Sequence, residues 1–321
     1  MSHPHEHPHD HDHEHTHRVF APHSHDHADS VDDALEASEL GIRAVKISLV
    51  ALAITALFQL VIVALSGSVA LAADTIHNFS DALTAIPLWI AFVVGRRAAT
   101  KRYTYGLGKA EDLAGLFVLL MISLSAAIAG YQAIRRLIHP IVIDNLGWVA
   151  AAGVIGFVGN ELVALYRIRI GRQIGSAALV ADGLHARTDG FTSLAVVLGA
   201  IGVWLGFPLA DPIVGLLITV AILMVLRTAA RDVFFRLLDG VDPHLVDTAE
   251  RVLAAEPGVV GVRGVRMRWI GHRLHADAEL DIDPSISLTD AHHLAHHAEH
   301  TLTHAVPKLS SALIHAYPAG H

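Results

Sequence analysis

The chain has 321 residues, a mean hydropathy of +0.47, 53% hydrophobic residues and only 17% charged residues. A water-soluble chain of this length would form about two domains with a polar surface, which this composition cannot supply. We therefore expect an integral membrane protein. The sequence contains no Cys, so disulfides, thiolate metal sites and Cys nucleophiles are excluded, and His, Asp and Glu remain as the strong metal ligands.

The net charge of −8 originates in the amino-terminal tail, residues 1–39, which holds ten acids, one Arg and eleven His. The remainder of the chain sums to +1. Because the tail has almost nothing apolar to bury, we expect it to be disordered. Its His residues predict a weak, multi-site collector of divalent metal, and a solvated tail that binds nothing is the alternative.

Six apolar stretches have the roughly 20 residues that a helix needs to cross a bilayer. They cover residues 44–67, 68–95, 112–134, 146–168, 177–207 and 209–226. If the amino terminus is cytoplasmic, thirteen Lys and Arg near the span ends lie inside and only Arg135 and Arg136 lie outside. This asymmetry predicts a multi-pass protein with both termini in the cytoplasm. We expect the protein to lie in the plasma membrane.

The composition after Leu238 becomes that of a small soluble domain. Two stretches there alternate polar and apolar residues and turn at Gly271 and His272, which predicts a hairpin. Helical stretches precede and follow the hairpin and a last strand ends the domain, giving the order αββαβ of a compact α+β domain. These elements are a helix from Pro243 and the ranges 259–270, 274–282, 287–306 and 312–317.

The sequence therefore predicts three parts. Residues 1–39 form the tail, residues 40–236 an all-α membrane domain of six spans, and residues 237–321 a cytoplasmic α+β domain.

Two of the spans carry the same polar pattern, Ala-Leu-x-Ala-Asp-x-x-His-x-x-x-Asp, at residues 70–81 and 178–189. The spacing places the three polar groups of each copy on one helical face, with the His and the second Asp one turn apart. An ionisable group inside a span costs at least about 2.5 kcal/mol, so six such groups in matched positions indicate a functional site.

The His and second Asp of the two copies are His77, Asp81, His185 and Asp189. Two imidazoles and two carboxylates make a tetrahedral ligand set that suits Zn²⁺. A hydrogen-bonded structural network and a proton relay without metal are the alternatives. Because the copies lie three spans apart, their helices run in opposite directions through the bilayer, as expected of an alternating-access transporter.

Other polar residues lie within the predicted spans. Asp74 and Asp182 are candidates either to orient the ligating His residues or to line a hydrated path into the site. Asn160 and Glu161 lie in the fourth span, where Glu161 has a candidate functional role or else reaches water or pairs with a nearby Arg. Arg187 points away from the ligand face, which favours pairing with an acid.

Over residues 40–318 the chain resembles the cation diffusion facilitator family of metal/proton antiporters. The resemblance depends on the two His-x-x-x-Asp helices and on the segment Arg-Tyr-Thr-Tyr-Gly-Leu-Gly-Lys-Ala-Glu at residues 102–111. It implies a homodimer with six spans and a ferredoxin-like cytoplasmic αββαβ domain. It also implies zinc efflux in exchange for protons, with His77, Asp81, His185 and Asp189 as the transport site.

The same resemblance implies further sites outside the spans. Glu279, His292 and His315 fall at or near metal-ligand positions of the cytoplasmic domain in relatives, although the set is altered here. Lys109 and Asp239 match positions that form a charge interlock beneath the membrane, and two solvated charges are the alternative.

The helix predicted over residues 287–306 has a face of His residues. Four of them, spaced one turn apart, are His292, His296, His300 and His304. Paired His at this spacing can chelate metal, which favours a weak metal sensor, but a polar face on a cytoplasmic helix needs no metal.

The predicted spans and the cytoplasmic domain lack the motifs of enzymes and of nucleotide binding. His-Glu-x-x-His occurs only in the His-rich tail, at residues 5–9 and 13–17, no Gly-x-Gly-Asp lies beside the intramembrane acids, and residues 106–109 lack the other parts of a phosphate loop. We expect no enzyme activity, no cofactor and no binding of nucleotide or nucleic acid; the metal is the transported substrate and a candidate regulatory ligand. The alternatives are a membrane-anchored metal sensor or storage protein, and the same transporter with Co²⁺, Cd²⁺, Fe²⁺ or Ni²⁺ as its main ion.

Overall fold

The structure is a computed structural model, and it describes residues 25–66, 85–139, 146–207 and 209–320. The first copy of the repeated motif, with Asp74, His77 and Asp81, lies outside the described residues, as does the tail up to residue 24.

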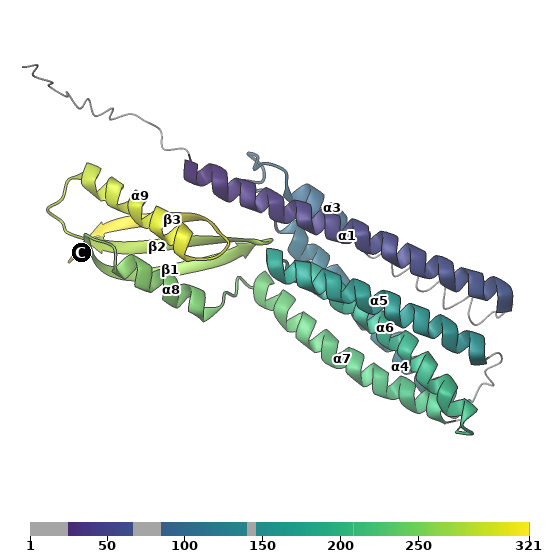
Figure 1. The fold of residues 1–321 in the computed structure, drawn as a ribbon. Helices are drawn as coiled ribbons and strands as arrows, with labels where there is room; N and C mark the ends of the chain where they lie inside the picture. Colours follow the sequence, from purple (N-terminus) through teal and green to yellow (C-terminus); the bar gives the residue numbers. More distant parts are fainter. Residues whose placement is uncertain (1–24, 67–84, 140–145, 208, 321) are drawn as a thin grey trace, which may run out of the picture.

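An elongated helical bundle forms the first part of the molecule (Figure 1). Its described helices are α1 (His25–Ser66), α3 (Ala85–Gly95), α4 (Ala110–Ile138), α5 (Leu146–Ile174), α6 (Ala177–Trp204) and α7 (Ala210–Leu237). Helices α1, α4, α5 and α7 are long and apolar enough to cross a membrane. Helix α6 has the length to span but carries several ionisable residues, and α3 is the described end of the second predicted span.

The helix ends differ from the predicted spans. Residues 25–39, expected to be disordered, belong to α1, so the predicted boundary of the tail is wrong. Residues 34–40 read Ala-Leu-Glu-Ala-Ser-Glu-Leu, a segment rich in residues of high helix propensity. Helices α4, α5 and α7 also continue four to eleven residues past the predicted ends, because a helix with basic residues can extend beyond the hydrocarbon into water.

Close packing of α5 against α6 positions the repeated motif of α6. A Cβ added at Gly171 would come within 2.8 Å of the Val180 side chain, and one added at Gly183 within 2.7 Å of the Ile168 side chain. Any larger residue at these positions would push the two helices apart. The absence of side chains at Gly171 and Gly183 therefore fixes how α6 lies on α5.

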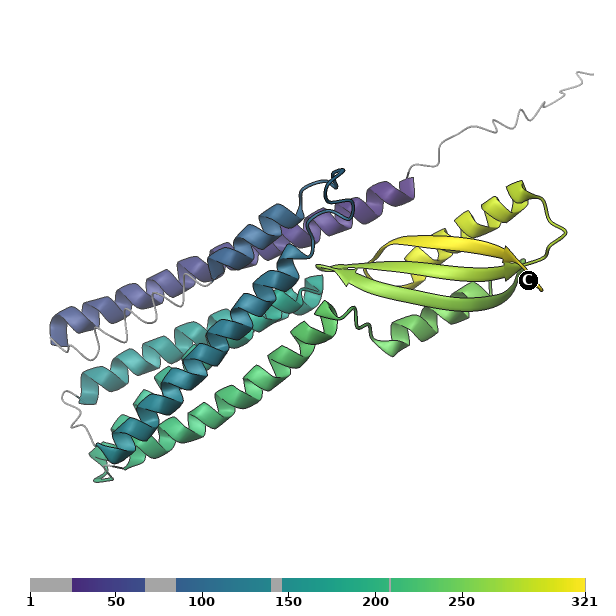
Figure 2. The same cartoon turned by 180° about the vertical axis from the view of Figure 1, so that it is seen from behind.

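A small α+β domain follows the bundle and confirms the predicted αββαβ order. Its elements are α8 (Pro243–Ala254), β1 (Val259–Ile270), β2 (Arg273–Ile282), α9 (Leu288–Ala305) and β3 (Leu309–Pro318). The sheet has the order β1-β2-β3, with β1 and β2 antiparallel and β2 and β3 parallel. Helices α8 and α9 cover one face of the sheet (Figure 2). Leu253, Leu274, Leu280 and Leu302 are fully buried between the layers.

Candidate functional site

Helix α6 begins at a well-defined cap and presents its motif to the interior of the bundle. The Ser176 side chain accepts a hydrogen bond from the backbone N–H of Leu179, at 3.0 Å, and so caps the first turn. Asp182, His185 and Asp189 follow, and they expose only 0%, 1% and 6% of their surface. The structure thus buries the three motif residues of α6, as the period of the sequence predicts.

His185 and Asp189 form the described half of the predicted metal site. Nδ1 of His185 lies 3.6 Å from Oδ1 of Asp189, one turn further along α6. Thr188 donates its hydroxyl hydrogen to the carbonyl of His185, and Thr192 donates to that of Asp189, so both hydroxyls are bound to the backbone. An imidazole nitrogen and a carboxylate oxygen at this spacing can bind one metal ion together.

The full ligand set is not within the described part of the chain. Among the described residues, no group of three or more His, Asp or Glu side chains lies close enough to hold a metal ion. His77 and Asp81, the two other predicted ligands, belong to residues 67–84, so the four-ligand site stays a prediction.

Asp182 has a partner that sequence reasoning missed. Its Oδ2 lies 2.9 Å from Nη1 of Arg167 on α5, and the two side chains expose 0% and 2% of their surface. Buried charges of this kind are normally paired, because an isolated charge in a low-dielectric interior is costly. By its position in the sequence Arg167 is one of the thirteen Lys and Arg at the inner span ends, and no local pattern connects it with Asp182.

Glu161 on α5 and Arg187 on α6 form a second ion pair between the same helices. Arg187 donates from Nη2 to Oε1 of Glu161 at 2.7 Å and from Nε to Oε2 at 3.1 Å, which is a bidentate geometry. The structure confirms the expectation that Arg187 pairs with an acid. The neighbouring Asn160 is buried and lies against Gly190 of α6.

Lys109 and Asp239, the predicted interlock residues, are in contact. Nζ of Lys109 lies 3.1 Å from Oδ1 of Asp239 and 3.6 Å from Oδ2 of Asp112. Asp239 follows α7 and Lys109 precedes α4, so this contact connects the two helices at the end of the bundle that faces the α+β domain.

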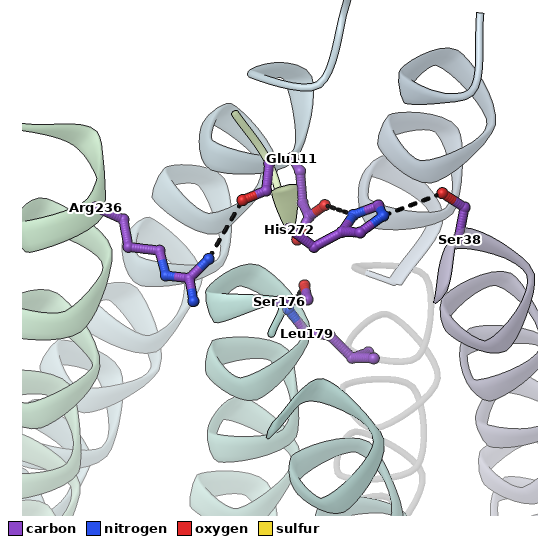
Figure 3. Close-up of polar contacts among 7 residues, drawn as sticks. Ser38, Glu111, Ser176, Leu179, Arg236 and His272 are labelled. Carbon is purple, nitrogen blue, oxygen red and sulfur yellow. Dashed lines mark hydrogen bonds and ion pairs between the residues drawn. The ribbon is translucent and has the colours of Figure 1, made fainter. Parts of the chain in front are cut away.

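The tip of the β1–β2 hairpin docks on the same end of the bundle (Figure 3). Nδ1 of His272 lies 2.9 Å from Oε2 of Glu111 on α4, and Nε2 lies 3.3 Å from Oγ of Ser38 on α1. Arg236 on α7 donates to the carbonyl of Gly271 at 3.2 Å. The hairpin therefore contacts three helices of the bundle. Sequence reasoning found the turn at Gly271 and His272 but not this contact.

The candidate ligands of the α+β domain are only partly brought together. Glu279 on β2 and His315 on β3 are neighbours across the parallel strands, whereas His292 is exposed on α9. The described residues of one chain contain no three-ligand cluster here either. On α9 the rings of His300 and His304 lie 4.4 Å apart, edge to face. Metal binding by these residues stays a prediction.

Comparison with protein families agrees with this architecture. Residues 45–238 match the model of the cation efflux transmembrane domain, and residues 241–319 match that of the cation efflux protein cytoplasmic domain. The fold and the two matches define a multi-pass membrane transporter with a carboxy-terminal α+β domain that supports a dimer. The chain belongs to the cation diffusion facilitator family, whose members export divalent metal cations.

Relatives are found in distant organisms. A "probable cation efflux system protein" of Mycobacterium tuberculosis (strain ATCC 25618 / H37Rv) is 74% identical over 303 residues, which cover 94% of this chain and 91% of that protein. The magnetosome protein MamB of Paramagnetospirillum magneticum is 25% identical, with 82% of this chain and 89% of that protein covered. Metal tolerance protein 2 of Oryza sativa subsp. japonica is 27% identical, with 91% and 82% covered. A solved nickel form of a MamM CTD variant is 19% identical, with a TM-score of 0.24, and covers 24% of this chain and 98% of that one.

Proposed function

We propose that this transporter moves Zn²⁺ out of the cytoplasm in exchange for protons, through a site formed by His77, Asp81, His185 and Asp189. The observation that carries the proposal is the buried His185–Asp189 pair of α6, one turn apart within a membrane-domain helix. The sequence repeats the same pattern at residues 70–81, which supplies a second matched pair of ligand types.

The chemistry of the four side chains favours zinc. Two imidazoles and two carboxylates fill a tetrahedral first coordination sphere, and the two carboxylate charges balance the charge of a divalent ion. Asp182, the third acidic or imidazole side chain on this part of α6, forms an ion pair with the Arg167 guanidinium. This pairing supports a ligand set in which α6 contributes only His185 and Asp189.

Proton exchange follows from the same ligands. A ligating His must be neutral and a ligating Asp must be ionised, so metal binding displaces protons and reprotonation releases the metal. In an inverted pair of motif helices, alternating access of one central site to the two membrane faces converts this competition into antiport. The transporter works as a homodimer in the plasma membrane with both termini in the cytoplasm.

Zinc uptake into proteoliposomes tests the site. We expect Asp189→Ala and His185→Ala to abolish uptake while the purified variants keep the elution volume of the wild type. Asp247→Ala removes an exposed carboxylate of α8, far along the chain from the motif, and is the matched control that should transport normally. Wild-type uptake by Asp189→Ala would contradict the site. Binding without uptake by the wild type would favour a metal sensor or storage protein instead.

A further inference from the structure

A cavity of about 550 Å³ lies where the bundle meets the α+β domain. Its walls come from the ends of α5 and α7, the start of α6, and segments of the α+β domain around Trp269 and Lys308. The volume is typical of ligand pockets, which hold about 300–1,000 Å³. Neither His185 nor Asp189, the described residues of the proposed metal site, lines this cavity, so it needs a separate explanation.

Three cationic side chains line the cavity: Arg172 at the end of α5, Arg236 at the end of α7 and Lys308 before β3. Within the described part of the chain, neither Arg172 nor Lys308 has a carboxylate at ion-pair distance, and Nζ of Lys308 donates only to the carbonyl of Arg172, at 3.3 Å. Burial, and then the Arg236 charge, lowers the pKa of Lys308 below its usual value. An anion in the cavity would relieve this crowding of positive charge.

The backbone holds Lys308 in this position. Its φ of +65° is in the left-handed region, which is unusual for a residue other than Gly. This conformation brings the Lys308 side chain against the turn between α5 and α6, where a Cβ added at Gly175 would lie 2.7 Å from Nζ. Non-Gly residues in such conformations are often found at binding sites.

Two carboxylates also line the cavity, but they do not make it a cation site. Asp242 already caps α8, with its side chain accepting from the backbone N–H of His244 at 3.0 Å. Asp232 interacts electrostatically with Arg236, which also interacts with Glu111 and Asp112 of α4. The positive charge of Arg172 and Lys308 is therefore the charge that no described carboxylate balances, and it disfavours a divalent metal and favours an anion.

The inner wall of the cavity is apolar. Val180, Ala181 and Leu184 of α6 and Ala229 of α7 extend it along the bundle, away from Arg236 at the end of α7. A ligand that matches both parts has a negatively charged phosphate at one end and a hydrocarbon chain at the other. Basic pockets between membrane helices bind anionic lipid headgroups in this way.

We propose that the cavity binds an anionic phospholipid of the adjacent leaflet. The phosphate group lies among Arg172, Lys308 and Arg236, and one acyl chain lies along the apolar wall between α6 and α7. The bound lipid connects the turn before α6 to Lys308 of the α+β domain.

Lipid retention by the full-length protein tests the proposal. The protein is purified in detergent and titrated with dioleoylphosphatidylglycerol, dioleoylphosphatidylcholine or sodium phosphate, and bound ligand is counted by native mass spectrometry. The test variant is Arg172→Gln/Lys308→Gln. The matched control, Arg169→Gln/Arg231→Gln, removes two exposed Arg from α5 and α7 outside the cavity. Arg172→Lys/Lys308→Arg keeps both charges and tests whether the positions tolerate substitution.

We expect the wild type, the control and the charge-conserving variant to retain phosphatidylglycerol in preference to phosphatidylcholine. The test variant should bind it more weakly by roughly fivefold for each cation removed. Equal binding of the two lipids by the wild type would overturn the proposal, as would an equal loss in the control variant. Saturable binding of inorganic phosphate without retention of phosphatidylglycerol would also overturn it, because it would identify a site for a free anion.

Discussion

Arg167 and Asp182 form an ion pair at 2.9 Å between α5 and α6, with 2% and 0% of their side-chain surfaces exposed. Asp182 lies one turn from His185, so the pair connects the proposed metal site to the neighbouring helix. Such a pair fixes the position of α6 electrostatically as well as by packing. Because Asp182 is paired with Arg167, its carboxylate is not available as a ligand of the proposed metal site.

Removing one member of this pair should damage the protein more than removing both. Arg167→Leu or Asp182→Leu leaves an uncompensated buried charge, which costs about 3–5 kcal/mol. The double variant leaves none and should be more stable than either single variant. Thermal unfolding of the purified protein measures this order. The exposed pair Arg96–Glu39 is the control, and Arg96→Ala should cost less than about 1 kcal/mol. Additive losses in the double variant would show that the pair is not coupled.

The contact of His272 with Glu111 and Ser38 predicts that the hairpin tip is held on the bundle. Because a hydrogen bond to a charged group contributes about 1.5–3 kcal/mol, His272→Ala should accelerate hydrogen exchange across residues 269–274 by roughly tenfold or more. His293→Ala removes an exposed His of α9 and should leave this exchange unchanged. An unchanged rate in His272→Ala would mean that other contacts alone hold the tip.

Gly271 should be intolerant of a side chain for two independent reasons. Its φ is +63°, and an added Cβ would lie 2.8 Å from the carbonyl oxygen of Gly108 at the end of the bundle. We expect Gly271→Ala to lower the unfolding temperature and to accelerate exchange in the hairpin. Gly264→Ala is the matched control on β1, because a Cβ there meets nothing within 4 Å. Equal effects of the two substitutions would refute the steric argument.

His275 should make the α+β domain less stable at low pH. Burial, followed by the charges of Arg268 and Arg273, lowers its pKa from 6.5 in the folded protein. The unfolded chain therefore binds a proton more readily than the folded protein. The contribution of neutral His275 to the free energy of unfolding is fully present above pH 6.5, and it falls as the pH drops from 6.5 towards the pKa of His275 in the folded protein. Hydrogen exchange of β2 and β3 between pH 5 and pH 8 measures this slope. His275→Gln should flatten it, and an unchanged slope in that variant would assign the effect to other groups.

Local patterns predicted most of the architecture. The alternation in β1 and β2, the turn at Gly271 and the start of α8 at Pro243 are all encoded within a few residues, and the structure has them where expected. The buried face of Asp182, His185 and Asp189 follows likewise from the period of the helix.

Contacts between distant segments could not be predicted in this way. Arg167 meets Asp182 because two Gly residues let α5 lie close to α6, and His272 meets Glu111 across 161 positions of sequence. Both contacts depend on how complete helices and strands pack against one another. The start of α1 could not be predicted for a different reason, since residues 25–39 combine the charge and His content of a disordered tail with high helix propensity.

The measurement that tests metal and proton exchange most directly is metal flux into proteoliposomes with an acidic lumen, with lumenal pH followed at the same time. Zn²⁺ is compared with Co²⁺, Fe²⁺, Mn²⁺, Ni²⁺ and Cd²⁺, and Asp189→Ala is run beside the wild type. We predict that Zn²⁺ enters fastest, that the lumen becomes more alkaline as it enters, and that both signals are absent in Asp189→Ala. Zinc entry that leaves the lumenal pH unchanged, or that persists in Asp189→Ala, would contradict proton exchange at the His and Asp site.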